Sequence, residues 1–376
     1  MTPRDADVIV VGGGLMGAAT AFFLRRRGRS VVVLERDRVG QHASGTNFGN
    51  VRRQGRFLPQ LPLANRAREI WGRLPELIGE DVEFLPTGHL RLACTPEEVG
   101  RMEAYARDCR PYGLDLELMS ANALRVRFPY LGREAVAGSF SPHDGHANPR
   151  LAAPAFARAA RRLGATIVEG AEVAAIEKAG EDFSVETADG RRYRAPVVQI
   201  CAGAWGGALS ARFGEPVPLT PRGPQMGVTE PVPYAVKPVV GVWAEGEAGI
   251  YFRQVARGNV VFGGGVWGEV DMVRRRAVLD PVSTLGQLPH LRRAMPAFGQ
   301  LAVIRTWSGI EGYVADRLPV MGASATTPGL YYAFGFSGHG FQLGPAVGEV
   351  MAELIDRGRS AVPIDPFGIA RFRDAA

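Results

Sequence analysis

The first 35 residues constrain the fold of this chain more than any other segment. A run of β-branched residues, Val8 to Val11, leads into a GxGxxG pattern. The glycines of this pattern are Gly12, Gly14 and Gly17. The pattern predicts a helix from about Leu15 to Arg27. A second apolar run, Ser30 to Leu34, predicts a strand that ends at Glu35. The Glu35 carboxylate can accept hydrogen bonds from both ribose hydroxyls. This order predicts an α/β fold with a dinucleotide site on a parallel sheet.

Each glycine of this pattern has a physical role in such a site. Gly12 allows the tight turn, Gly14 lets the backbone approach the phosphates, and Gly17 lets the helix pack closely on the sheet. Leu15 and Met16 open the helix, where free N–H groups and the positive end of the helix dipole face a pyrophosphate. A glycine-rich turn without a ligand is the alternative.

Two further segments indicate which dinucleotide is bound. Beyond the second strand lies a loop of small and polar residues that a nicotinamide enzyme does not usually need. Its candidate cofactor contacts are Arg36, His42, Ala43, Ser44, Asn47, Gly49 and Asn50. Near the C-terminus, a glycine-rich block precedes an amphipathic helix predicted from about Pro345 to Asp356. The block includes Trp307, Gly309, Asp316, Gly338, His339, Gly340, Phe341 and Gln342.

These two blocks resemble the signatures of the flavin amine oxidoreductases of the D-amino acid oxidase, glycine oxidase and sarcosine oxidase family. The resemblance runs over nearly the whole chain and is diffuse only between about 84 and 141 and between about 223 and 300. It implies FAD as cofactor, with the C-terminal glycines and a helix N-terminus suited to the partly negative edge of reduced flavin. It also implies that Val173 lies beside the adenine. A second glycine turn resembles the family's and contains Ala202, Gly203 and Trp205.

The resemblance further implies how the chain is divided. With 376 residues, the chain exceeds the usual size of a single hydrophobic core. The expected fold class is α/β, with α+β character overall: a Rossmann-like FAD-binding domain interleaved with an antiparallel-sheet substrate domain. We expect the FAD-binding domain at 1–83, 142–215 and 306–376, and the substrate domain at 84–141 and 216–305.

Composition argues against several other functions. The net charge is +6, but the basic residues are scattered, with short runs only at 25–27 and 274–276, so an anionic substrate is expected and no nucleic-acid partner. Cys94, Cys109 and Cys201 form no CxxC pair, which argues against a metal site and favours a reducing, cytoplasmic location. No stretch offers the roughly 20 apolar residues of a membrane span.

Candidate substrate contacts come from three segments. Tyr251 and Arg253 alternate on a predicted strand, so a phenol and a guanidinium would point together toward a substrate carboxylate. An Arg on the solvent face of the sheet is the alternative for Arg253. Arg52 and Arg53 follow the flavin loop and are further candidates, and pairing of one of them with an acid or phosphate is the alternative. His339 lies among small residues, where it contacts substrate or flavin or makes a structural hydrogen bond to the turn.

The chain departs from the family's pattern at the expected carboxylate anchor. The D-amino acid and glycine oxidases commonly carry an Arg after the Trp-x-Gly-hydrophobic sequence, and this chain has Glu311 there. A carboxylate cannot clamp another carboxylate. Either the anchor has moved to Arg253 or Arg52, or Glu311 binds the cationic amine of the substrate.

Other departures concern the flavin link and the electron acceptor. The segment 307–316 lacks the Cys that links flavin in monomeric sarcosine oxidases, and Gln342 replaces their Lys. We therefore expect non-covalent FAD, although His42 keeps a covalent link open because its sequence context is similar to that of dimethylglycine dehydrogenases. The two lysines, Lys178 and Lys237, lie outside the motifs, so dehydrogenase activity remains open beside oxidase activity.

Together these features predict an FAD-dependent enzyme that oxidises the C–N bond of a small amino acid by hydride transfer to flavin N5, giving an imine that hydrolyses. The expected substrate is a secondary amine such as iminodiacetate or sarcosine, or a D-amino or imino acid. Electrons would pass to O2 or to a partner, with a homo- or hetero-oligomer as the assembly. A second hypothesis is the catalytic subunit of a heteromeric opine or hydroxyproline dehydrogenase. A flavin monooxygenase is the third, and the C-terminal block argues against it.

Overall fold

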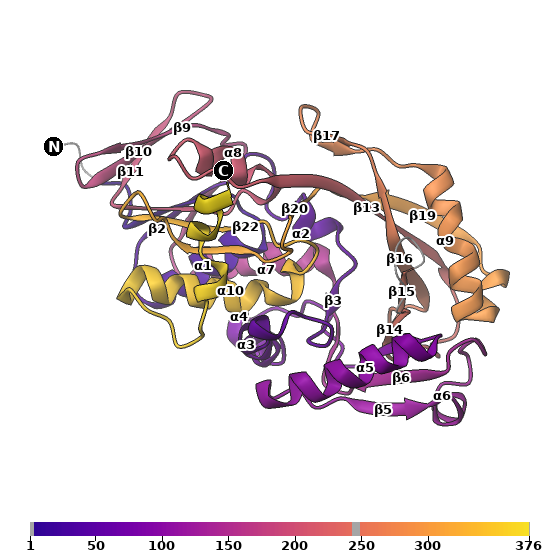
Figure 1. The fold of residues 1–376 in the computed structure, drawn as a ribbon. Coiled ribbons are helices and arrows are strands. Elements are labelled where there is room, and N and C mark those ends of the chain that lie inside the picture. Colours follow the sequence, from indigo (N-terminus) through magenta and orange to yellow (C-terminus); the bar gives the residue numbers. More distant parts are fainter. Residues whose placement is uncertain (1–3, 243–248, 376) are drawn as a thin grey trace.

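A six-stranded sheet forms one half of the molecule in the computed structural model, which describes residues 4–242 and 249–375 (Figure 1). The strand order is β21-β22-β12-β1-β2-β8, and all neighbours are parallel except β21 and β22. The strands are β1 (Val8–Val11), β2 (Val31–Leu34), β8 (Thr166–Val168), β12 (Val197–Ile200), β21 (Val320–Ala323) and β22 (Leu330–Phe334).

Both faces of this sheet are buried, which explains why its strands are apolar throughout. Val8 and Val10 point to a face covered by helices, whereas Ile9 and Val11 point to a face covered by a three-stranded sheet. The helices are α1 (Leu15–Arg26), α7 (Pro149–Arg162) and α10 (Gly340–Arg357), and α3 (Leu61–Trp71) packs on α10. The small sheet contains β9 (Val173–Ala179), β10 (Asp182–Thr187) and β11 (Arg192–Ala195).

A nine-stranded sheet forms the other half, in the order β19-β13-β16-β15-β14-β4-β6-β5, with β20 on β13 (Figure 1). Parallel pairing of β4 with β14 joins two distant parts of the chain in one sheet, and helix α9 (Pro281–Ala294) packs on β16 and β15. The strands are β4 (His89–Ala93), β5 (Glu117–Ser120), β6 (Ala137–Ser141), β13 (Leu219–Pro231), β14 (Val239–Val242), β15 (Ile250–Gln254), β16 (Asn259–Gly268), β19 (Val303–Ser308) and β20 (Glu311–Val314).

The architecture agrees with the expected fold class, and several element boundaries differ from the sequence-based expectation. β19 and β20 both belong to the large sheet, so the segment from residue 306 begins in that sheet and not in the cofactor half. Helix α10 begins at Gly340, five residues before the predicted start at Pro345. The large sheet is also mixed, because β4 and β14 run parallel in a sheet that is otherwise antiparallel.

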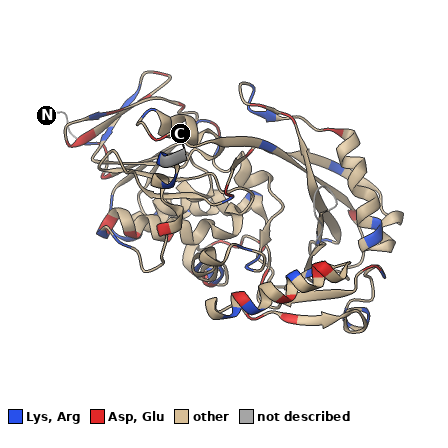
Figure 2. Cartoon of the chain, viewed as in Figure 1, with Lys and Arg blue, Asp and Glu red and all other residues tan. Residues whose placement is uncertain are grey.

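Acidic and basic residues are interspersed over both halves of the molecule (Figure 2). Within residues 4–242 and 249–375, no helix combines the length and the apolar character that crossing a membrane requires.

Candidate active site

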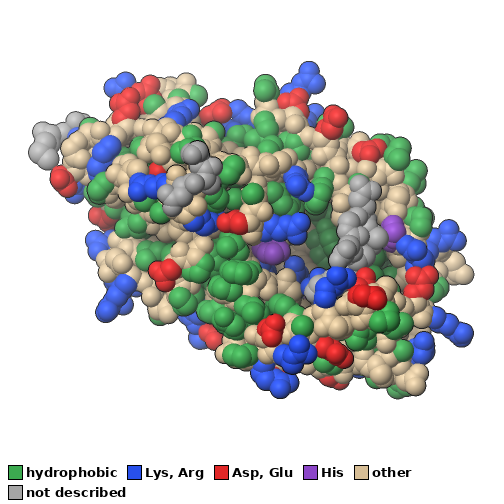
Figure 3. Space-filling model, in the orientation of Figure 1, with side chains coloured by type: hydrophobic (Ala, Val, Ile, Leu, Met, Phe, Trp, Pro, Cys, Tyr) green, Lys and Arg blue, Asp and Glu red, His purple; other side chains and the backbone are tan. Residues whose placement is uncertain are grey.

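A cavity of about 900 Å³ lies between the two large sheets and is lined by residues of both. The residues from the six-stranded half sit at the carboxyl ends of β1, β2 and β12, where open α/β sheets bind their ligands. The opposite wall comes from β13, β15, β16 and β20. Figure 3 shows this face of the molecule hollowed between the two halves, with basic and histidine side chains near the hollow.

The glycine turn after β1 leaves no room for side chains. Gly12 has φ +107°, and a Cβ there would lie 2.5 Å from the carbonyl oxygen of Cys201. A Cβ on Gly17 would lie 2.0 Å from the Gly12 oxygen, so Gly17 permits close packing of helix and strand as its position predicted. Gly14 is the N-cap of α1 and makes no side-chain capping bond. The N-terminus of α1 therefore faces the cavity, and its N-cap position contributes no side chain.

Backbone amides hold Glu35 at the end of β2. Its Oε2 accepts a hydrogen bond from the Gly13 amide at 2.6 Å, and its Oε1 accepts one from the Asp37 amide at 2.8 Å. The side chain is only 8% exposed and lines the cavity. Its carboxylate is thus fixed where the motif predicts a ribose.

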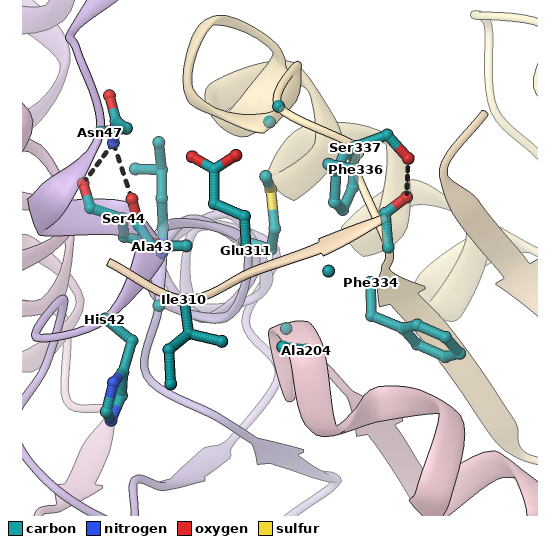
Figure 4. A pocket seen from close by; sticks show the side chains of 18 of the residues that line it. His42, Ala43, Ser44, Asn47, Ala204, Ile310, Glu311, Phe334, Phe336 and Ser337 are labelled. Carbon is teal, nitrogen blue, oxygen red and sulfur yellow. Dashed lines mark hydrogen bonds between the residues drawn. The ribbon is translucent and has the colours of Figure 1, made fainter. Parts of the chain in front are cut away.

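The loop after β2 is braced by its own polar side chains. Asn47 donates from Nδ2 to the carbonyl oxygens of Ala43 and Ser44 at 2.9 and 2.8 Å (Figure 4), and Ser44 Oγ accepts from the Leu15 amide at 2.8 Å. This hydrogen bond joins the loop directly to the N-terminus of α1. Among the described residues, the buried Oδ1 of Asn50 has no hydrogen-bond partner, which leaves an acceptor available at the cavity.

His42 is tied to its neighbours at the edge of this loop. Its Nε2 lies 2.8 Å from Asp37 Oδ2, and its ring packs edge-on against Trp205 with centroids 5.1 Å apart. Arg36 also contacts Trp205, because its guanidinium carbon lies 4.2 Å from the Trp205 ring centroid. One ring nitrogen of His42 is therefore engaged by a carboxylate.

An arginine from the half that contains the large sheet forms ion pairs near the loop that follows β2. Arg275 lies between β17 (Val270–Asp271) and β18 (Arg276–Ala277) and has φ +59°. Its guanidinium forms ion pairs with Asp37 at 3.2 Å and with Glu172 at 2.7 Å. Both carboxylates belong to the cofactor half, so this contact bridges the two halves.

The C-terminal block presents a second helix N-terminus. Ser337, with φ +50°, accepts a hydrogen bond from the Val314 amide and thereby joins the turn to β20. Gly338 has φ +79°, and α10 then begins without a side-chain cap. Within the described chain, His339 Nδ1 and Gln342 Oε1 are buried without hydrogen-bond partners. This turn therefore offers backbone N–H groups and unsatisfied polar atoms to the cavity.

Nearly all of the predicted cofactor contacts line this one cavity. They are Gly12, Gly14, Leu15, Met16, Glu35, Arg36, His42, Ala43, Ser44, Asn47, Gly49, Asn50, Val173, Ala202, Gly203, Trp205, Gly338, His339, Gly340, Phe341 and Gln342. Gly17 and Gly309 do not line it. A Cβ on Gly309 would lie 1.8 Å from Thr46 Oγ1, so this glycine lets the β19–β20 turn contact the flavin loop.

Arg253 does not reach the cavity. Tyr251 and Arg253 share a face of β15, since both contact Phe48, and Tyr251 lines the cavity. The Arg253 guanidinium is held instead by the Phe48 carbonyl oxygen at 2.8 Å and by His146 Nδ1 at 3.1 Å, and the side chain is 5% exposed. The position expected of a substrate anchor is thus occupied by a buried arginine that braces the cofactor loop.

Several other arginines line the cavity, and Arg52 and Arg56 are two of them. Arg56 is 4% exposed, and its Nε donates to the Arg52 carbonyl oxygen at 3.0 Å. Its Nη1 donates to the His339 carbonyl oxygen at 3.4 Å. Neither Arg52 nor Arg56 forms an ion pair with a carboxylate of the described residues, and burial together with the neighbouring Arg52 lowers the pKa of Arg56 to about 9. Arg56 is buried and Arg52 is partly buried, and two such cations without a carboxylate in an ion pair form a site for an anion.

A carboxylate lies on the facing wall of the cavity. Figure 4 shows Glu311 pointing into the pocket from β20, away from its neighbour Ile310. Tyr313 donates a hydrogen bond from its hydroxyl to Glu311 Oε2 at 3.0 Å. Burial raises the pKa of Glu311 to about 7, although the Tyr313 hydrogen bond acts in the opposite direction. Glu311 forms no ion pair with any described residue, so it is suited to a cationic group of a ligand.

Arg56 and Tyr313 were not among the site residues predicted from the sequence. Arg56 lies four positions after Arg52 in a segment with three arginines directly behind the flavin loop, and that clustering was an available signal. Tyr313 lies two residues after Glu311, so the alternation of a strand would have placed the two side chains together. No cluster of three or more metal-ligating side chains occurs within 4–242 and 249–375.

Comparison with known proteins agrees with this arrangement. Residues 7–354 match the family model DAO, described as FAD dependent oxidoreductase. The glycine oxidase of Geobacillus kaustophilus (strain HTA426) is 30% identical over 375 residues, a match covering 97% of both chains. Sarcosine oxidase subunit beta of Arthrobacter sp is 26% identical and covers 98% of this chain and 91% of that protein. Among solved structures, L-proline dehydrogenase from P. horikoshii superposes with a TM-score of 0.92 at 28% identity, over 99% of each chain.

Proposed function

Because the chain belongs to the DAO family of FAD dependent oxidoreductases, we propose that it oxidises the C–N bond of a small anionic amino acid. The observation that carries this proposal is the charge pattern of the cavity. Arg52 and Arg56 supply two cations without acidic partners, and Glu311 supplies a carboxylate without a basic one. An amino acid, with its carboxylate and its amine, complements both.

The cavity fits FAD on observations of the chain itself. The turn at Gly12 and the N-terminus of α1 suit a pyrophosphate, because this turn carries no side chains and a helix N-terminus attracts anions. A Cβ on Gly12 would clash with the Cys201 carbonyl oxygen and so displace the turn. Glu35 suits a ribose, and the Gly338–Gly340 turn suits the flavin ring edge with its bare N–H groups. A covalent link through His42 stays a lesser alternative, since Asp37 engages one of its ring nitrogens.

The chain's own residues orient the substrate and accept the proton of its amine. Bound FAD supplies the two-electron acceptor for the hydride of the C–H bond next to nitrogen. Arg52 and Arg56 hold the carboxylate and fix which C–H bond faces the ring. Glu311 binds the cationic amine and takes its proton, so that the nitrogen lone pair can form the C=N bond as the hydride leaves. Water then hydrolyses this imine to a carbonyl compound and an amine.

Electrons leave the enzyme to O2 or to a partner protein. No lysine of the described residues lines the cavity, so the chain lacks an ammonium group near the reacting atoms to promote oxygen reduction. A relative of this chain is a sarcosine oxidase subunit, which supports a heteromeric assembly. The second candidate function is the catalytic subunit of a heteromeric dehydrogenase of the opine or hydroxyproline type.

Product analysis tests the proposal. The FAD-loaded protein is incubated with an artificial electron acceptor and, in turn, glycine, sarcosine, iminodiacetate, D-amino acids and proline derivatives, and the carbonyl product is identified by mass spectrometry. We expect product from at least one of them, and O2 in place of the dye then separates oxidase from dehydrogenase. No product from any of them contradicts the proposal.

A further inference from the structure

Another of the arginines that line the cavity lies apart from the Arg52–Arg56 pair. Arg222 lies on β13, where alternate residues face the cavity, as Thr220 and Pro224 also do. Its guanidinium carbon is 4.0 Å from the ring centroid of Trp267 and 5.2 Å from that of Tyr313. No carboxylate of the described residues pairs with it. The aromatic rings hold the planar group by its face, which leaves its N–H edge free to bind an anion.

Glu311 lies between this arginine and the other two. Arg222 and Glu311 are paired neighbours of β13 and β20, and Tyr313 contacts both side chains. On the other side, a Cβ on Gly338 would lie 3.6 Å from Glu311 Oε2, and the next residue in the chain accepts the hydrogen bond of Arg56. Across Glu311 the order is therefore Arg56 on the side of the α10 turn, where Arg317 also lines the cavity, then Glu311, then Arg222 on β13.

This order matches a secondary amine with a carboxylate on each side of the nitrogen. Glycine, sarcosine and proline each carry one carboxylate, which the Arg52–Arg56 pair would take, and each leaves Arg222 without a ligand. A ligand with two carboxylates would satisfy all three cationic groups and place its nitrogen near Glu311.

We infer that Arg222 binds a second substrate carboxylate, and that the substrate of this enzyme is an imino dicarboxylate. The inference rests on the proposed function and adds the substrate class. Arg222 is then a specificity-determining residue, since it distinguishes dicarboxylic from monocarboxylic amines without contact to the bond that is oxidised.

Binding of unreactive analogues tests this inference without turnover. In thiodiacetate a sulfur replaces the nitrogen between two carboxylates, and methylthioacetate is its counterpart with one carboxylate. Calorimetry on the FAD-loaded protein gives the Kd of each. We expect thiodiacetate to bind at least tenfold more tightly, and Arg222→Gln to reduce this preference about tenfold or more. Arg222→Lys should retain part of the preference, because the charge remains and the fork is lost.

Arg305→Gln is the matched control, because Arg305 is an exposed residue of the same sheet that does not line the cavity. It should leave the ratio of the two Kd values within twofold. Equal affinities in the unaltered protein, or an unchanged ratio in Arg222→Gln, would overturn the inference. The ratio is also unchanged if Arg222→Gln weakens the affinity for both ligands equally, and this result would overturn the inference because Arg222 would then not distinguish the second carboxylate. If sarcosine is oxidised while the ratio stays unchanged, the inference fails and the proposed function stands.

Discussion

Protonation of Glu311 should make kcat/KM decrease at acidic pH, which gives the pH profile an acidic limb. Its pKa is raised to about 7 by burial, so the carboxylate is ionised above this pH and protonated below it. A protonated Glu311 neither attracts a cationic amine nor accepts its proton. At pH 6 only about a tenth of the molecules carry the ionised form, and kcat/KM should fall about tenfold for each pH unit below 7.

Two substitutions separate this cause from others. Glu311→Gln removes the titrating group, so the limb should disappear and the plateau of kcat/KM should drop by about tenfold to a hundredfold, the range for a lost hydrogen bond to a charged group. Tyr313→Phe removes the hydrogen bond that favours the ionised form. The limb should then move to higher pH.

The assay is the pH dependence of kcat/KM between pH 5 and 9, with the substrate identified by product analysis. Glu269→Gln is the control, because Glu269 is exposed and does not line the cavity. It should reproduce the profile of the unaltered protein. A flat profile across pH 6 to 7.5, or an acidic limb that persists in Glu311→Gln, would refute the assignment of Glu311.

Three further predictions concern other parts of the cavity. Arg56→Met should raise the KM for an anionic substrate on the order of tenfold to a thousandfold in steady-state assays, and a change below threefold would remove it as an anchor. Gly12→Ala should give a folded protein that purifies without the yellow of FAD, because a Cβ would clash 2.5 Å from a carbonyl oxygen; a yellow variant would contradict this. Arg275→Ala should lose FAD faster on dialysis than Arg274→Ala, because only the first substitution breaks the ion pairs between the halves; equal rates would exclude a role in retention.

The cofactor half was predictable because its signals are local. Apolar strands, the glycine turn and the acid at the end of β2 lie within 35 residues, and sheet order places their ends at one edge. The start of α10 was mispredicted because Pro345 is typical of a first helical turn, whereas the helix begins in the glycine turn before it. β19 agrees with a strand expected at about 303–309 in the antiparallel sheet, whereas the place of β20 depends on its pairing with β13, which local pattern does not reveal.

The same reason explains why most of the motif residues line one cavity, whereas Arg253 does not reach it. Strand alternation correctly put Tyr251 and Arg253 on one face, but it could not show that His146 and the flavin loop bind the Arg253 guanidinium. Those partners come from distant segments. Arg56 belongs to no motif, and its role as a cavity cation arises only when α10 and the loop after β3 (Asn50–Val51) come together.

The central claim, that this cavity brings an amino acid to FAD for C–N oxidation, is tested most directly by the visible spectrum of the FAD-loaded protein under anaerobic conditions. Glycine, sarcosine, iminodiacetate, D-amino acids and proline derivatives are added one at a time. The account predicts that at least one of them bleaches the flavin band, that about one equivalent suffices, and that an imine-derived carbonyl compound accumulates. A yellow protein whose spectrum none of them changes would contradict amino acid oxidation, and a protein that cannot bind FAD would contradict the assignment of the cavity itself.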